Sequence, residues 1–238
     1  MSTPLLLLPG HMCDVRLWSD CAPPLRGAGC TLRFAELTSA ASIETLADDA
    51  LALAPPTFIA VGFSMGGIVA LTMARRAPGR VKGLVLIDTT ADADGPARLK
   101  TRLDLEHRVR AGDLADVVRD DLKPRYFAST TSSDHPARAL SFQMAVELGA
   151  DVFLRQSAAL RARIDLRSHL HEIAAPTLLL CGAQDTLCPP TLHDAMAEAL
   201  PSARVVVVPD AGHMTPLEQP FYFAGAVLRW RAQDVRTA

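Results

Sequence analysis

The stretch Thr57–Gly67, TFIAVGFSMGG, joins a short apolar run to a Gly-x-Ser-x-Gly motif. A continuous apolar run predicts a strand that is buried on both faces, as in a parallel sheet. The apolar residues from Met65 to Ala77 predict a helix that Pro78–Gly79 ends. Ser64 therefore falls on a sharp strand-to-helix turn, which presents a hydroxyl clear of the backbone while the flanking glycines relieve crowding. This stretch predicts that Ser64 is a nucleophile.

The same alternation of short apolar runs and helical patterns continues along most of the chain. Expected strands cover residues 5–8, 31–35, 57–62, 81–87, 177–181 and 205–208, and expected helices cover 43–53, 65–77, 190–200 and 216–231. Strands that alternate with helices are typical of an α/β fold with a mostly parallel sheet flanked by helices.

Residues 89–173, called the insert below, interrupt this alternation. They contain no convincing strand and predict helices over 97–111, 114–122, 136–148 and 152–162. We expect a helical cap that belongs to the same domain as the core, residues 1–88 and 174–238, and that covers the carboxyl edge of the sheet, where open α/β sheets bind ligands. The insert's 11 Arg and 2 Lys balance its 13 Asp and Glu, so its summed charge predicts no anionic substrate.

Composition and charge describe a compact domain that handles a small molecule. The 238 residues are 49% hydrophobic and carry a net charge of −2, which favours neither nucleic acid nor an anionic membrane. The run Leu5–Leu8 is too short for a signal sequence or a membrane span. Five cysteines without CxxC spacing predict reduced thiols, no zinc site and a cytoplasmic location.

A serine nucleophile needs a base and a carboxylate that orients it. His213 follows the expected strand 205–208, so its loop lies at the same sheet edge as Ser64 and His213 is the expected base. Two carboxylates, Asp185 and Asp88, each follow an expected strand, and position alone leaves both open as the orienting group. Either could also be an ordinary strand-ending residue.

The tetrahedral oxyanion formed by acyl transfer needs two N–H donors. Met65 opens the expected helix, where the first N–H groups have no partner within the helix. After the first expected strand, Gly10 allows a tight turn that leaves the His11 N–H pointing toward Ser64. The backbone N–H groups of His11 and Met65 are the expected oxyanion hole.

Four segments together resemble the α/β-hydrolase superfamily: LLLLPGH at 5–11, GFSMGG at 62–67, GAQD at 182–185 and AGH at 211–213. The chain order Ser, Asp, His is that of this fold. Within the superfamily, the sequence looks most like the group of pimeloyl-carrier methyl esterases and 3-oxoadipate enol-lactonases. The resemblance implies Ser64 as nucleophile, His213 as base and Asp185, rather than Asp88, as the orienting acid.

The resemblance further implies a carboxylic ester hydrolase that works through an acyl-enzyme on a small or medium acyl substrate, without metal or organic cofactor. A carbon–carbon bond hydrolase or lyase on the same triad, or a slow ligand sensor, are the alternatives. The sequence leaves monomer and homodimer equally open. Candidates for an apolar pocket wall are the large side chains of the insert, Tyr126, Phe127, Phe142, Met144 and Phe153.

Overall fold

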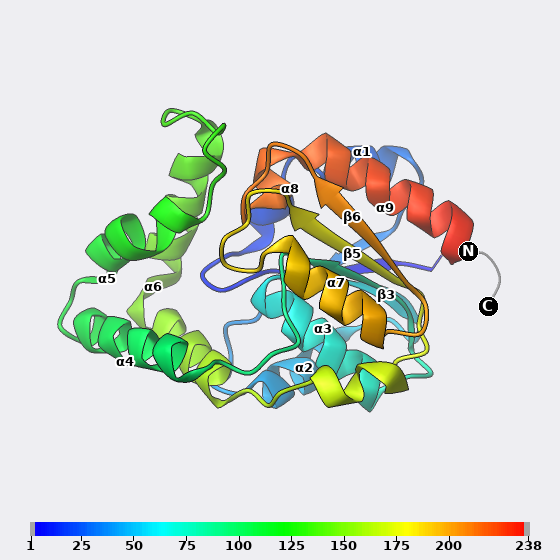
Figure 1. Ribbon diagram of the computed structural model, residues 1–238, viewed down its shortest axis with the longest axis horizontal. Coiled ribbons are helices and arrows are strands. Elements are labelled where there is room, and N and C mark those ends of the chain that lie inside the picture. The colour runs from blue at the N-terminus through cyan, green and yellow to red at the C-terminus, as the bar shows by residue number, and fades with distance from the viewer. Residues whose placement is uncertain (1–2, 236–238) are drawn as a thin grey trace.

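The computed structural model describes residues 3–235, and a parallel sheet forms its centre (Figure 1). The strands are β1 (Leu5–Leu8), β2 (Leu32–Phe34), β3 (Phe58–Phe63), β4 (Val81–Ile87), β5 (Thr177–Gly182) and β6 (Ala203–Val208). Their order is β2-β1-β3-β4-β5-β6, and every pairing is parallel. The predicted α/β class with a parallel sheet is confirmed.

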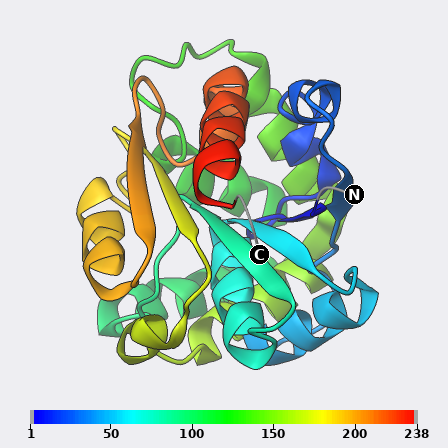
Figure 2. The ribbon, with the colours of Figure 1, turned by 90° about the vertical axis from the view of Figure 1, so that its right-hand side faces the viewer.

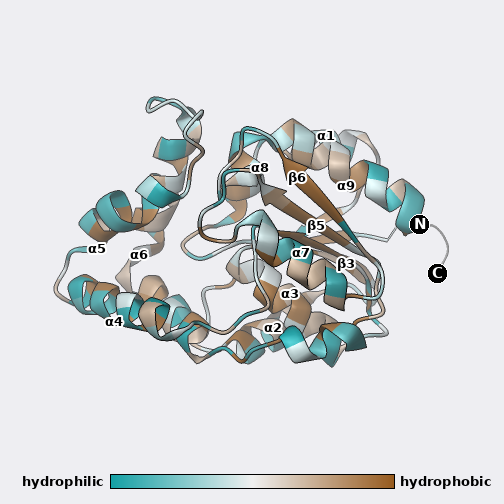
Figure 3. Cartoon of the chain, viewed as in Figure 1, coloured by the Kyte–Doolittle hydropathy of each residue, from teal (hydrophilic) through white to brown (hydrophobic). Residues whose placement is uncertain are grey.

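Helices cover both faces of the sheet, because successive side chains of each strand point to opposite sides (Figure 2). One face packs against α1 (Ala22–Gly27) and α9 (Pro220–Asp234). The other packs against α2 (Ile43–Leu53), α3 (Met65–Arg76) and α7 (Pro190–Ala199). Figure 3 shows the resulting apolar strands between helices with polar outer faces. The sheet is therefore buried between two apolar cores.

The insert supplies the helices that lie beyond the end of the sheet toward which the strand arrows point (Figure 1). The elements of this segment are α4 (Pro96–Arg110), α5 (Leu114–Asp116), η2 (Val117–Leu122), η3 (Lys123–Arg125), α6 (Pro136–Ala162) and η4 (Arg167–Glu172). Gly149, at φ 84° and ψ 172°, divides α6 into the two helices that the sequence predicts. η2 is π-helical, whereas the sequence predicts one continuous helix over 114–122.

The C-terminal helical segment differs from the expected single helix over 216–231. A short α8 (Thr215–Glu218) precedes α9, and Gln219 between them has φ −134° and ψ 54°. Pro220 causes this break, since proline has no N–H and disfavours helical geometry in the residue before it. The short helix η1 (Val15–Trp18), which the sequence analysis did not predict, begins where Asp14 accepts a hydrogen bond from the Arg16 N–H. Across residues 3–235, every helix is too short or too polar to cross a membrane.

Candidate active site

Ser64 lies on the turn between β3 and α3 in a strained backbone conformation, at φ 51° and ψ −115°. Non-glycine residues rarely adopt this geometry, which persists only where the surroundings hold it. Here the Ser64 N–H donates to the Ile87 carbonyl at 2.8 Å, and the Thr89 hydroxyl donates to the Ser64 carbonyl at 2.7 Å. Both bonds come from the adjoining end of β4, so the sheet itself fixes the turn.

The glycines on either side of Ser64 allow neighbouring backbone segments to approach one another closely at this turn. A Cβ atom at Gly62 would lie 2.3 Å from the Gly66 carbonyl oxygen, and one at Gly66 would lie 2.2 Å from the Leu8 carbonyl oxygen. Neither spacing accommodates a methyl group. The Gly-x-Ser-x-Gly pattern is therefore a steric requirement of the close approach among β1, β3 and α3.

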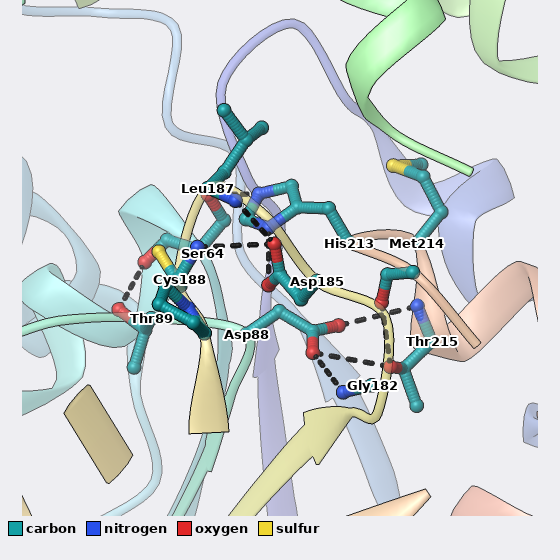
Figure 4. A network of polar contacts seen from close by, with 12 residues as sticks. Ser64, Asp88, Thr89, Gly182, Asp185, Leu187, Cys188, His213, Met214 and Thr215 are labelled. Atoms are coloured by element: carbon teal, nitrogen blue, oxygen red, sulfur yellow. Dashed lines mark hydrogen bonds and ion pairs between the residues drawn. The ribbon is translucent and has the colours of Figure 1, made fainter. Parts of the chain in front are cut away.

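The structure brings Ser64, His213 and Asp185 together, as the sequence analysis expects (Figure 4). Ser64 Oγ lies 3.0 Å from His213 Nε2, and His213 Nδ1 lies 2.8 Å from Asp185 Oδ2. The other carboxylate oxygen of Asp185 accepts hydrogen bonds from the N–H groups of Leu187 and Cys188, at 2.7 and 3.0 Å. Burial alone would raise the pKa of Asp185, but the His213 ring and these hydrogen bonds lower it below its ordinary value. The geometry thus gives a buried, ionised carboxylate against the imidazole.

Asp88, the second candidate for the orienting acid, supports the two loops that carry Asp185 and His213. Its Oδ1 accepts hydrogen bonds from the Gly182 N–H at 2.9 Å and the Thr215 hydroxyl at 3.1 Å, and its Oδ2 accepts one from the Thr215 N–H at 3.2 Å. Burial, and then the charge of Asp185, raise the pKa of Asp88 well above its ordinary value. A protonated Asp88 can stay buried beside an ionised Asp185.

Glu218, which the sequence analysis missed, ties the His213 loop to the insert. Its Oε2 accepts hydrogen bonds from the N–H groups of Gly212 and Met214, at 2.9 and 3.2 Å. Its Oε1 accepts from the Ala128 N–H at 2.7 Å and from the Thr131 hydroxyl at 2.6 Å. The His213 N–H itself donates to the Tyr126 carbonyl at 2.8 Å. Nothing in the sequence distinguishes Glu218 from a surface glutamate, because its burial comes from the insert folding back.

The two expected oxyanion donors, His11 and Met65, border the same cavity as Ser64. Met65 is the first residue of α3, and among residues 3–235 no acceptor takes the N–H of Met65 or of His11. The loop before His11 lies against the serine, since a Cβ atom built on Gly10 would be 3.2 Å from Ser64 Cβ. Both N–H groups therefore remain available beside the hydroxyl.

A cavity of about 290 Å³ opens over Ser64 and His213, between the core and the insert. Of the five large side chains expected to form its wall, Tyr126 and Phe153 do so. Phe127 and Met144 are instead buried in the core beside α9, and Phe142 packs against a smaller cluster that the insert forms with Met12. The cavity is of the size that takes a small organic molecule.

One group of three potential metal ligands occurs within residues 3–235, formed by Asp185, Cys188 and His213 with ligand atoms within 4.8 Å of one another. The aspartate and histidine already bond to each other. Burial, together with the charge of Asp185, raises the pKa of the Cys188 thiol well above its ordinary value, which disfavours the thiolate that a metal requires. The arrangement fits a hydrogen-bonded relay better than a metal centre.

The family model of the alpha/beta hydrolase fold matches residues 18–220, and the chain belongs to this family. A pimeloyl-[acyl-carrier protein] methyl ester esterase of Aromatoleum aromaticum is 30% identical over 91% of this chain and 93% of its own. Among solved structures, a thermophilic esterase from Thermogutta terrifontis with malate bound is 29% identical, with a TM-score of 0.86 over 100% of this chain and 92% of its own.

A further solved structure, the enol-lactonase of Burkholderia xenovorans LB400, shares the fold with a TM-score of 0.84. It is 23% identical over 98% of this chain and 93% of its own. The similarity to the methyl ester esterase group that the sequence motifs indicate is confirmed by the relative from Aromatoleum aromaticum.

Proposed function

We propose that this protein is a serine hydrolase that cleaves a small or medium carboxylic ester or lactone through an acyl-enzyme on Ser64. The observation that carries the proposal is the unbroken relay from the Ser64 hydroxyl through His213 to Asp185, with spacings of 3.0 and 2.8 Å. The family relationship and the esterase names of its relatives support it.

In the first half of the reaction, Ser64 Oγ attacks the ester carbonyl carbon while His213 Nε2 takes the hydroxyl proton. Asp185 accepts a hydrogen bond from the Nδ1–H group of His213. This bond keeps Nε2 unprotonated, so that it can act as the base, and it stabilises the imidazolium that forms. The carbonyl oxygen becomes an oxyanion that the N–H groups of His11 and Met65 stabilise. When the tetrahedral intermediate collapses, the alkoxide leaves with the proton from Nε2 as an alcohol.

In the second half, His213 Nε2 takes a proton from water as the water oxygen attacks the acyl carbon. The second tetrahedral intermediate collapses, and Ser64 Oγ leaves with the proton from the imidazolium. The acid is released and the free hydroxyl is restored. A lactone follows the same course, except that the leaving hydroxyl stays in the same molecule as the acid.

The test uses p-nitrophenyl esters from acetate to decanoate with the wild type, Ser64→Ala and Ser168→Ala, the last an exposed serine of η4 as control. We expect turnover by the wild type and the control, none by Ser64→Ala, and a fluorophosphonate adduct on Ser64 by mass spectrometry. Equal turnover by Ser64→Ala would overturn the role of Ser64. If the wild type hydrolyses no ester but cleaves a carbon–carbon bond in a vinylogous diketone, the ester assignment is wrong.

A further inference from the structure

Four arginines of the insert, Arg98, Arg102, Arg125 and Arg163, line the cavity that contains Ser64 and His213. Two of them stand on one face of α4, where Arg98, Thr101, Arg102 and Leu105 all reach the cavity wall. Residues at this spacing share one side of a helix. The cavity is therefore bordered by arginines on the side that the insert forms.

Few carboxylates offset these charges. Asp94, whose side chain is fully buried, pairs with Arg163 at 2.9 Å and with Arg102, and lies 3.7 Å from Arg98. Asp94 is not itself a wall residue, and Asp121, a carboxylate that is on the wall, pairs at 2.5 Å with Arg108, which is not on the wall. One carboxylate thus serves three guanidiniums.

Arg125 is the guanidinium that has no partner. It makes no hydrogen bond or ion pair with any other of the described residues, although its neighbour Tyr126 is held firmly. The Tyr126 carbonyl accepts the His213 N–H at 2.8 Å, so the backbone next to Arg125 is tied to the His213 loop, and Arg125 itself is an exposed residue of the cavity wall. By contrast, Arg98 donates to the Leu187 carbonyl at 2.9 Å and Arg163 to the Asp92 carbonyl at 2.8 Å. Those two residues have a structural role that Arg125 lacks.

The nearby titratable groups reflect the same excess of positive charge. His11 is on the cavity wall, and no described residue bonds to its Nε2. Burial, then the charges of Arg102 and Lys123, lower the pKa of His11 to about 3. His11 is thus a neutral imidazole at neutral pH. It does not add to the cationic charge of the cavity, and it leaves that charge to the arginines.

We propose that the substrate carries a free carboxylate in addition to its scissile ester, and that Arg125, on the cavity wall, binds this carboxylate. This inference rests on the proposed ester hydrolysis. The planar fork of a guanidinium matches the two oxygens of a carboxylate, and an ionised pair forms stronger hydrogen bonds than a neutral one. The cavity volume of about 290 Å³ has room for a hemiester of a short dicarboxylic acid or a lactone of similar size.

The test compares two matched p-nitrophenyl esters at each chain length from succinyl to adipoyl, one ending in a carboxylate and the other in a carboxamide. For the wild type we expect a kcat/KM about tenfold higher for the carboxylate at the best chain length, the gain from a charge-assisted hydrogen bond. Arg125→Gln should remove most of this preference, because it should lower kcat/KM for the carboxylate ester much more than for the carboxamide ester. Arg33→Gln, at an exposed arginine of β2 away from the cavity, should keep it.

Equal kcat/KM for the two esters, or a preference that survives in Arg125→Gln, would overturn the inference while leaving ester hydrolysis intact. If neither ester is hydrolysed, the proposed function fails, and binding then decides the inference separately. Calorimetry of Ser64→Ala with monomethyl glutarate and with the methyl ester of glutaramic acid measures it without turnover. Tighter binding of monomethyl glutarate that is lost in Ser64→Ala/Arg125→Gln supports the arginine site, and equal binding refutes it.

Discussion

Replacing Glu218 with glutamine tests whether the buried glutamate positions the catalytic loop. The carboxylate accepts four hydrogen bonds, two from the N–H groups that flank His213 and two from the insert. A glutamine keeps one acceptor oxygen, and its NH2 group must face one of the two pairs. The lower-energy choice points the NH2 toward Thr131, whose hydroxyl can turn to accept, and leaves the Ala128 N–H without an acceptor.

One unsatisfied buried N–H costs about 1–3 kcal/mol. For a chain of this length, that corresponds to a fall in Tm of roughly 2–12 °C. Because the glutamine oxygen still holds Gly212 and Met214, kcat should fall less than about tenfold, by the scale of 1.4 kcal/mol per decade. Glu218→Ala releases the loop as well, and we expect a larger loss of kcat with little change in KM.

Thermal unfolding, urea titration and steady-state kinetics on p-nitrophenyl butyrate measure these effects. Glu198→Gln, at an exposed glutamate of α7, removes the same charge without a buried contact and should leave Tm and kcat unchanged. A Tm of Glu218→Gln within 1 °C of the wild type, on the scale above, would show that the hydrogen bonds to Glu218 do not contribute measurably to stability. Undiminished kcat in a folded Glu218→Ala would refute the positioning role.

Asp185→Asn preserves shape but removes the charge beside the catalytic imidazole, so kcat should fall roughly a thousandfold or more with KM little changed, as steady-state kinetics will show. The buried ring of His193 accepts the Thr89 N–H at Nε2, and burial lowers its pKa from 6.5 to about 4. The unfolded chain therefore binds more protons between those values, and stability should fall by up to about 3 kcal/mol as pH drops through this window. Urea unfolding at pH 7 and pH 5 should show a smaller difference for His193→Gln than for the wild type. Gly66→Ala places a methyl group against the Leu8 carbonyl and should lower stability by about 3 kcal/mol or more, measured as the urea midpoint.

The sheet and the Ser64 turn could be predicted because their determinants are local. Residues 84–87 are continuously apolar and buried, as expected for a strand covered on both faces, and β4 (Val81–Ile87) has its one half-buried polar position, Lys82, near its beginning. The Gly-x-Ser-x-Gly motif shows its steric reason within five residues. The break at Gln219 was missed because a helical pattern on both sides of Pro220 suggests continuity, although a proline there removes a donor.

The roles of Asp88 and Glu218, which support the loops of Asp185 and His213, could not be predicted from local sequence patterns. Asp88 and Asp185 look alike in the sequence, since each follows a buried strand, and only the fold shows that Asp185 reaches His213 while Asp88 bonds Gly182 and Thr215. Glu218 is an even clearer case, because its partners in the insert lie 87 and 90 residues away. A buried carboxylate of this kind depends on contacts that no spacing rule records.

The charge of the insert shows why a sum along the chain does not describe a cavity. Its basic and acidic residues cancel in number, yet its acids are largely solvated: Asp104, Asp113, Asp116, Asp120, Asp134, Glu147 and Asp151 are all exposed. The arginines at 98 and 102 are one turn apart on the inner face of α4, and only Asp94 is buried among them. Solvent screens the exposed acids, and it also screens Arg98 and Arg125, whereas it screens the buried Arg163 and the largely buried Arg102 much less. The electrostatic potential inside the cavity therefore depends on the face of α4 that lines it. In the sequence, the i, i+4 spacing of Arg98 and Arg102 indicates that both residues share this face.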